Sequence, residues 1–235
     1  MDGTDLRFTI SAVRRMLFRE GCDSQTAGHV SARDPENPDH FYVSPFQYFD
    51  ETLPSHIVKS TLDLQLLEGD WTPSPAISFH AAIYRARPDV NSVIHTHSRA
   101  VCAVGTTGRT IGMYHVSSAL FHKDQGVSGA NPRDEAIVAA LGSSNHVALL
   151  RNHGAVVAED TLEKAAIKAM VLEKAAQYHI DAEALDGEPM SEEDSALMRG
   201  SHEKYFIPNM WEAHLRRLRR SDPELFEAAA PALAR

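Results

Sequence analysis

The chain has 235 residues, of which 43% are hydrophobic, so it is long enough to bury a full-sized core without disulfides. Acidic residues outnumber basic ones by 32 to 23, giving a formal net charge of −9, which argues against a protein that binds nucleic-acid phosphates. No stretch approaches the roughly 18 apolar residues of a membrane span, residues 1–5 do not look like a signal peptide, and only two cysteines are present, so we expect a cytoplasmic protein.

The first half of the chain predicts two helices separated by turns and a short strand. Apolar residues at helical spacing predict an amphipathic helix over 5–20. Residues 26–33 are small and polar, and they predict a turn that brings backbone N–H groups close to an anion. A short strand is expected at 41–43, and a second helix over 78–87, which Pro88 stops.

The second half alternates strands with helices. We expect strands at 90–95, 146–150 and 155–157, and helices at 98–104, 133–141, 160–183, 191–204 and 208–220. Asp160, with Glu163 three residues later, has the pattern of a capping box for the long helix. This alternation predicts an α/β domain in which helices cover a central sheet. No linker or repeat interrupts the chain, so we expect a single domain over 1–235 with a helical extension from about residue 190.

Three histidines form the clearest chemical pattern. His95 and His97 end a run of β-branched residues, and alternate side chains of a strand point to one face, so both imidazoles can reach one ion. His153 directly follows a later strand, and Gly154 removes a side chain where the backbone must bend. Three imidazoles leave positions open for substrate and accept Zn, Mn, Fe or Co. The sequence predicts one divalent metal here; the alternative is three ordinary members of a set of 13 histidines.

The motifs around these histidines resemble a known family. Segment 88–97, segment 149–154 and the helix start at 159–165 are similar to the class II aldolase/adducin family, over about residues 6–183. The resemblance implies a three-layer α/β/α domain around a central, mostly antiparallel sheet. It also implies a small-molecule substrate and a homotetramer with its active site near a subunit interface.

Two positions that serve aldol chemistry in this family differ here. Where the aldolases carry a catalytic Glu, this chain has Ala76, and the tyrosine that assists cleavage falls at Val116. Aldol cleavage needs a base that removes a hydroxyl proton. Decarboxylation needs an electron sink and a proton donor instead, and a fixed carboxylate beside the departing one would repel the substrate. Ala76 therefore favours decarboxylation.

The phosphate-binding loop implied by the resemblance has also lost donors. Thr26 and Gly28 remain, but His29 replaces an Asn, a Thr-Gly pair becomes Phe46-Gln47, and the second serine is Pro75. These losses weaken the case for a sugar-phosphate substrate. We expect this region to bind a different substrate through Thr26, Gly28, Ser44, Phe46, Gln47 and Ser74.

Together these features predict a metal-dependent carbon–carbon lyase, a carboxy-lyase rather than an aldehyde-lyase. The expected substrate is a hydroxylated aromatic or heteroaromatic (di)carboxylate, such as a dihydroxyphthalate or a hydroxypyridine dicarboxylate, within aromatic compound catabolism. A phenolic oxygen ortho to the carboxylate could chelate the open metal positions.

Several residues are candidates for handling this substrate. Arg99, two residues after His97, is a candidate carboxylate clamp, and an ordinary ion pair is the alternative. The candidate proton donors are His115, His29 and His80, of which His80 better fits a buried supporting position. Ring contacts are expected from Phe46, Tyr48 and Phe121, each of which is equally well explained as a core aromatic.

Three other functions stay open from the sequence. A sugar-phosphate aldolase or epimerase would need its acid–base group moved to another residue, such as Asp124 or Glu135. A three-histidine Fe(II) oxygenase would use the open metal positions for O2. An adducin-like interaction domain would bind no stoichiometric metal, and the retention of all three histidines argues against that role.

Overall fold

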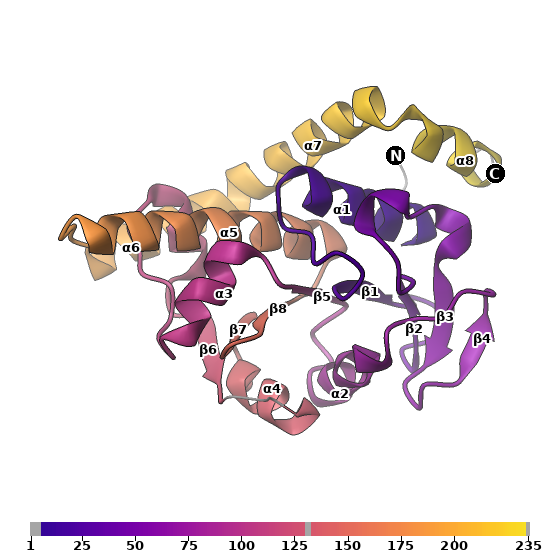
Figure 1. Ribbon diagram of the computed structural model, residues 1–235, viewed down its shortest axis with the longest axis horizontal. Coiled ribbons are helices and arrows are strands. Elements are labelled where there is room, and N and C mark those ends of the chain that lie inside the picture. The colour runs from indigo at the N-terminus through magenta and orange to yellow at the C-terminus, as the bar shows by residue number, and fades with distance from the viewer. Residues whose placement is uncertain (1–5, 130–132, 234–235) are drawn as a thin grey trace.

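A central sheet organises the chain, for which the computed structural model describes residues 6–129 and 133–233 (Figure 1). Within these residues the sheet has eight strands in the order β4-β3-β2-β1-β5-β8-β7-β6. The strands are β1 His29–Arg33, β2 His40–Val43, β3 Val58–Thr61, β4 Leu66–Glu68, β5 Ser92–Thr96, β6 Gln125–Ser128, β7 Val147–Leu150 and β8 Gly154–Glu159. Neighbours pair antiparallel except β6 with β7. The expected mostly antiparallel α/β sheet is therefore confirmed.

Helices cover both faces of this sheet and complete three layers. The helices are α1 Leu6–Arg19, α2 Ser78–Ala86, α3 Arg99–Thr106, α4 Asp134–Leu141, α5 Leu162–Ala184, α6 Glu192–Ser201, α7 Ile207–Ser221 and α8 Pro223–Leu233. One hydrophobic core joins α1, α3, α5 and α7 to one face, and a second joins α2 and α4 to the other. Figure 1 shows α2 and α4 on the opposite side of the strands from α1 and α5.

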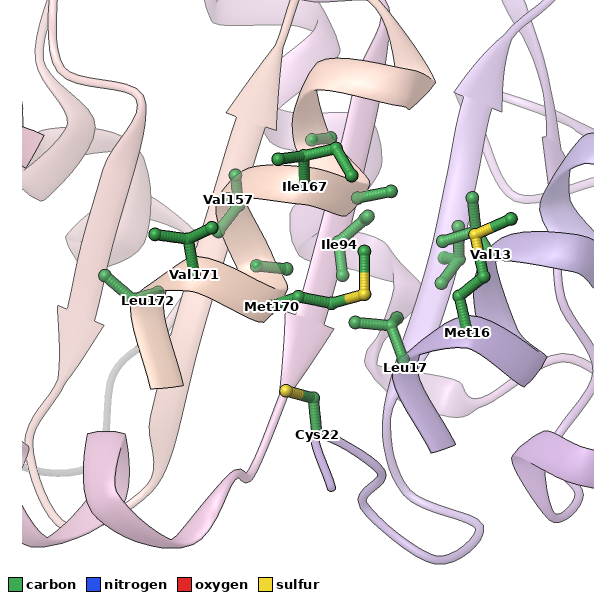
Figure 2. Close-up of a cluster of buried hydrophobic side chains, with 14 of the residues drawn as sticks. Val13, Met16, Leu17, Cys22, Ile94, Val157, Ile167, Met170, Val171 and Leu172 are labelled. Atoms are coloured by element: carbon green, nitrogen blue, oxygen red, sulfur yellow. The ribbon is translucent and has the colours of Figure 1, made fainter. Parts of the chain in front are cut away.

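The long helix α5 is held by an apolar stripe that lies on the central strands. Ile167 and Met170 of α5 lie over Ile94 of β5 and Val157 of β8, and Leu17 of α1 closes the cluster (Figure 2). Each such fully buried side chain stabilises the fold by about 1.5–3 kcal/mol. Because Ile94 faces this core, the residues directly before and after it in β5, Val93 and His95, face α2 on the other side of the sheet.

The helices expected from apolar spacing are present in the structure. The helix expected over 5–20 is α1, with residue 5 outside the described part of the chain. The expectation that Asp160 caps α5 is wrong, because Thr161 is the capping residue. Thr161 Oγ1 accepts from the Lys164 N–H at 3.3 Å, whereas the Asp160 carboxylate pairs with the Lys164 ammonium at 2.9 Å. The extended backbone of Thr161, with φ −135°, places its hydroxyl over the first turn.

The expected polar turn over 26–33 is also corrected, because residues from His29 onward form a central strand. Residues 29–33 pair with β2 on one side and with β5 on the other, so this part of the segment belongs to the sheet and not to a turn. The strands β3, β4 and β6 were not predicted, because three or four residues give too short a pattern to recognise, and the 11-residue helix α8 was not predicted either. Over residues 6–129 and 133–233, no helix has the length and apolar character to cross a bilayer.

Candidate metal centre

One strand end and one turn bring the three predicted metal ligands together. His95 lies in β5, His97 follows it, and His153 lies in the turn between β7 and β8. Their ligand nitrogens lie within 4.8 Å of one another, and the Nε2 atoms of His95 and His97 are 2.8 Å apart. The burial decreases from His95 to the exposed His153, so the group opens to solvent on one side.

Close packing of β8 against β5 explains the glycine after His153. A Cβ on Gly154 would lie 2.2 Å from the Thr96 carbonyl oxygen and 2.9 Å from Cδ2 of His97. The bend itself falls two residues earlier, at Asn152, whose φ is 57°. Gly154 therefore keeps room for the His97 ring, and the expectation that it supplies the bend is corrected.

The second hydrogen bond of His95 directs its lone pair. Its Nδ1–H donates to the Ala155 carbonyl at 2.9 Å, which leaves Nε2 unprotonated and facing the other two rings. Burial and the neighbouring imidazoles hold the pKa of His95 well below its usual range and lower that of His97 to about 4. Burial also lowers the pKa of His153. Three neutral imidazoles are the donor set that suits Zn, Mn, Fe or Co, so the residues fit a divalent cation.

His29 lies beside this group without joining it. In the β1–β5 ladder His29 is paired directly with His95, and their ring centroids are 5.0 Å apart. His29 Nδ1 lies 2.6 Å from Nε2 of His80, and both rings are fully buried. His29 Nε2 has no hydrogen-bond partner among the described residues. Burial lowers the pKa of both histidines, so they are neutral.

A buried arginine that the sequence analysis missed holds the neighbouring loop. The Arg14 guanidinium donates to the carbonyl of Gly28 at 3.1 Å, to Ser44 Oγ at 2.9 Å and to the carbonyl of Gln47. Arg14 is fully buried, and no carboxylate of the described residues pairs with it. Burial lowers its pKa to about 9. It was missed because an arginine within an amphipathic helix usually marks the solvent face.

Residues 9–180 match the family model for the Class II Aldolase and Adducin N-terminal domain. This chain belongs to the class II aldolase and adducin family. L-fuculose phosphate aldolase of Escherichia coli K12 is 32% identical over 204 residues, which cover 80% of this chain and 90% of that protein. Beta-adducin of Homo sapiens is 31% identical over 189 residues, 75% of this chain but 26% of adducin. A solved aldolase II superfamily protein from Pseudomonas syringae aligns with a TM-score of 0.83 at 26% identity, over 92% of this chain and 93% of that one.

At the position of the aldolase Glu, this family member has a short 3-10 turn, Pro75–Ile77, without a carboxylate. The Ala76 N–H donates to Ser74 Oγ at 3.2 Å, so Ser74 caps the turn. Burial and the neighbouring His153 ring lower the pKa of His97, and burial lowers the pKa of His153. No carboxylate is among these causes. Among the described residues, no hydrogen bond or ion pair joins His95, His97 or His153 to a carboxylate.

The loop beside the centre exposes two aromatic rings. Phe46 and Tyr48 are 50% and 49% exposed, and Thr26 is half-buried. Gln47 is buried between them, and its Nε2 donates to His56 Nδ1 at 3.1 Å. Phe121, by contrast, is fully buried in the core under α5, so the expectation that it contacts a substrate ring is wrong.

Two of the expected catalytic residues make no contact with the three histidines in one chain. The His115 ring stacks on Tyr178 of α5, with centroids 4.2 Å apart, and its Nδ1 bonds Ser117 Oγ at 2.8 Å. Arg99 is exposed as the first residue of α3, and within the described residues its side chain has no hydrogen bond or ion pair. Both stay predictions.

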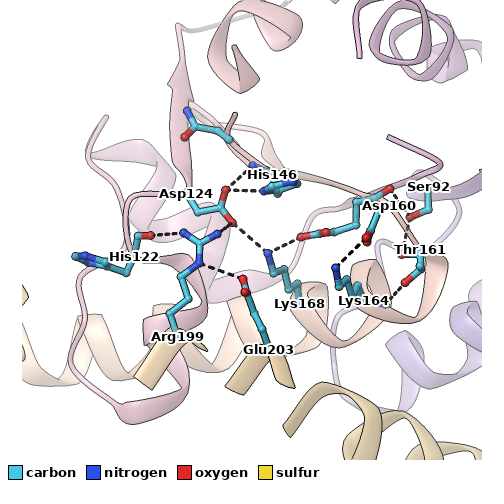
Figure 3. Close-up of polar contacts among 12 residues, drawn as sticks. Ser92, His122, Asp124, His146, Asp160, Thr161, Lys164, Lys168, Arg199 and Glu203 are labelled. Carbon is cyan, nitrogen blue, oxygen red and sulfur yellow. Dashed lines mark hydrogen bonds and ion pairs between the residues drawn. The ribbon is translucent and has the colours of Figure 1, made fainter. Parts of the chain in front are cut away.

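A second group of possible metal ligands lies at the other end of the strands. Asp124, His146 and Glu159 also have ligand atoms within 4.8 Å of one another. Lys168 of α5 lies among them, 3.1 Å from Asp124 Oδ2 and in contact with Glu159, and Arg199 approaches Asp124 at 3.2 Å (Figure 3). The length of β8 separates this cluster from His153 by roughly 15–20 Å. Asp124 is therefore wrongly placed to be the relocated base of an aldolase.

Proposed function

We propose that this chain is a divalent-metal-dependent lyase that decarboxylates a hydroxylated aromatic or heteroaromatic carboxylate. The observation that carries the proposal is the composition of the centre: three imidazoles converge, and no carboxylate of the described residues is paired with them by a hydrogen bond or an ion pair. An anionic substrate can then approach without repulsion, whereas an aldolase would lack the base that starts its reaction.

The loop held by Arg14 supplies the binding site for the substrate anion. Bound to the three histidines, a divalent cation would act as a Lewis acid for the phenolic oxygen. Arg14 is a positive charge without a carboxylate partner directly beneath Gly28, Ser44 and Gln47. A substrate carboxylate against this loop compensates that charge at low dielectric. The exposed rings of Phe46 and Tyr48 provide apolar surface for an aromatic ring.

The reaction breaks the bond between the ring carbon and the carboxylate, and CO2 leaves. A proton first adds to that ring carbon while the neighbouring hydroxyl gives up its proton, so that the hydroxyl-bearing carbon becomes a carbonyl. When CO2 then leaves, the electron pair of the broken bond restores the aromatic ring and the negative charge returns to the phenolic oxygen, which takes up a proton. We assign proton delivery to His115 of a neighbouring copy in a homotetramer, because His115 has no contact with the histidines of its own chain. Arg99, exposed at the start of α3, is the proposed clamp for the departing carboxylate.

Subunit sharing gives a direct test of the His115 assignment. His95→Ala and His115→Ala should each abolish turnover, and mixed tetramers of the two inactive variants should regain part of it, because some sites then combine an intact centre with an intact donor. A mixture that stays inactive although the tetramers exchange subunits would overturn the assignment.

The reaction class is tested by CO2 release from dihydroxyphthalates and hydroxypyridine dicarboxylates, with zinc or manganese supplied. We expect turnover on at least one of them. Ala76→Glu should lower it strongly through charge repulsion, and the matched Ala76→Gln should lower it much less. No CO2 from any of these substrates would contradict the proposal.

A sugar-phosphate aldolase is the second candidate, favoured by the similarity to L-fuculose phosphate aldolase. Phosphoglycolohydroxamate mimics the enediolate of that reaction, and tight binding of this compound would support the aldolase. We expect weak binding, because the loop has lost the Asn, Thr-Gly and second Ser donors expected of a phosphate site.

A further inference from the structure

His29 lies next to the candidate metal centre with one buried ring nitrogen that has no partner among the described residues. It lies across the ladder from His95, with ring centroids 5.0 Å apart, yet it is not one of the grouped ligands. Its Nε2 is buried without a partner among the described residues. A buried polar atom of this kind is costly unless something that binds in the site satisfies it.

A line of buried hydrogen bonds leads away from the other nitrogen of His29. Nδ1 of His29 lies 2.6 Å from Nε2 of His80, Nδ1 of His80 lies 2.6 Å from Ser31 Oγ, and Ser31 Oγ lies 2.7 Å from the Tyr84 hydroxyl. All four side chains are at most 1% exposed. The line therefore alternates between residues of β1 and α2, and its side chains are closed to solvent.

The protons in this line can be placed by counting donors and acceptors. The Tyr84 hydroxyl is fully buried, and the side-chain atom within reach that can accept its proton is Ser31 Oγ. Ser31 must then donate to Nδ1 of His80, so a neutral His80 carries its proton on Nε2 and donates to Nδ1 of His29. A neutral His29 is left with its proton on Nε2. The reverse direction would leave the tyrosine proton without an acceptor.

His29 and His95 thus have opposite tautomers although they face each other. His95 donates from Nδ1 to the Ala155 carbonyl and keeps a lone pair on Nε2, as a metal ligand must. His29 keeps a proton on Nε2 and has no lone pair to offer there. This difference explains why the nearest imidazole to the group is not a fourth ligand.

We propose that His80, Ser31 and Tyr84 are positioning residues that hold His29 as a hydrogen-bond donor toward an anionic oxygen of the substrate. The carboxylate or phenolate of a hydroxylated aromatic acid is the group it would take, and this part rests on the proposed function. His29 is then an electrostatic contact and not the source of the transferred proton, because a proton given up at Nε2 would have to be replaced through Tyr84, at the far end of a buried line.

The tautomers of His29 and His95 can be measured without an activity assay. In metal-free protein labelled with 15N-histidine, two-bond proton–nitrogen correlations distinguish the two ring nitrogens. We expect the proton on Nε2 of His29 and on Nδ1 of His95. His80→Leu removes the donor and should give His29 a mixture of tautomers, whereas His80→Gln, whose amide N–H replaces the imidazole donor, should keep the Nε2–H form.

Two further variants protect the test against a folding defect. Tyr84→Phe removes only the last hydroxyl and should give a smaller change than His80→Leu. Ser60→Ala, a buried serine of β3 that bonds only neighbouring backbone carbonyls, is the matched control and should change nothing at His29. A proton on Nδ1 of His29 in the wild type, or an unchanged tautomer in His80→Leu, would overturn the proposal.

Binding and turnover separate this inference from the proposed function. With zinc supplied, salicylate is the probe: His80→Leu should weaken its binding about ten-fold and His80→Gln about two-fold or less, as expected for one lost hydrogen bond to a charged group. In turnover, His80→Leu should lower kcat more than it raises KM. The expected tautomers with no CO2 release from any substrate would refute only the proposed function, and turnover with the opposite tautomers would refute only the role of the buried line.

Discussion

The two ends of the central strands each gather three side chains that could bind a metal, but only one end leaves their lone pairs free. His95, His97 and His153 meet at one end, and Asp124, His146 and Glu159 meet at the other, each set within 4.8 Å. At the second end Lys168 already lies between the two carboxylates, whereas at the first end no cationic side chain of the described residues pairs with the histidines.

This difference shows that the spacing of ligand atoms does not by itself define a metal site. Two buried carboxylates require a compensating cation, and an ammonium group from α5 provides one within the fold. Three neutral imidazoles require nothing, and they keep their lone pairs for a cation from solution. One cluster therefore stabilises the fold and the other is available for chemistry.

The largest expected difference between the two ends is in metal content. His95→Ala should not retain stoichiometric metal, because two imidazoles bind a cation far more weakly than three. The loss of metal affinity should exceed the roughly 10–100-fold caused by altering a residue that only supports a ligand. Asp124→Asn should retain the metal. Metal analysis of the purified proteins measures both, and retention by His95→Ala together with loss by Asp124→Asn would reverse the assignment of the two ends.

Removing the internal cation should have the next largest effect. Lys168→Met would leave Asp124 and Glu159 buried without compensation and should lower the free energy of unfolding by about 3–5 kcal/mol. Lys164→Met is the matched control from the same helix, because its pair with Asp160 is exposed and contributes less than about 1 kcal/mol. Urea unfolding of both variants checks this, and equal losses would contradict the structural role of Lys168.

A smaller effect is expected at the glycine that makes room for the centre. Gly154→Ala would push a methyl group against the Thr96 carbonyl and the His97 ring, and should cost about 1–3 kcal/mol of stability as well as weaken metal binding. Gly200→Ala in α6, where nothing lies within 4 Å, should be neutral or slightly stabilising. Thermal unfolding and metal titration of the pair would show whether space at Gly154 is required.

The smallest effect concerns pH: both ends lose stability as the pH falls, but over different pH ranges. In metal-free protein the folded pKa of His97 is about 4 against an ordinary value of 6.5, so the unfolded state binds the proton first and stability falls as pH decreases from about 6.5 to 4. The pKa of Asp124 is lowered by its contacts with His146 and Lys168 against the opposing effect of burial, so its contribution is lost only below the ordinary carboxyl value of 3.8. Urea unfolding across this range should show both steps. His97→Gln should make only the first step smaller, because the other buried histidines still contribute to it.

The sequence by itself determined the elements with long repeating patterns and the three histidines of the candidate metal centre. The apolar stripes of α1 and α5 repeat over several turns, so the helical period is visible without tertiary information. His95 and His97 are two residues apart at a strand end, where local geometry alone puts both side chains on one face. His153 followed from its position after a strand and before a glycine that packing requires.

The tertiary structure decided everything that depends on which strands become neighbours. Pairing of β1 with β5 puts His29 beside His95, and the packing of α2 brings His80 to it, although 51 positions separate these two histidines in the sequence. The same long-range assembly buried Arg14 beneath a loop and placed Lys168 between two carboxylates. Hydrogen-bond direction, burial and charge compensation are properties of such contacts, and a local pattern of residues contains no information about them.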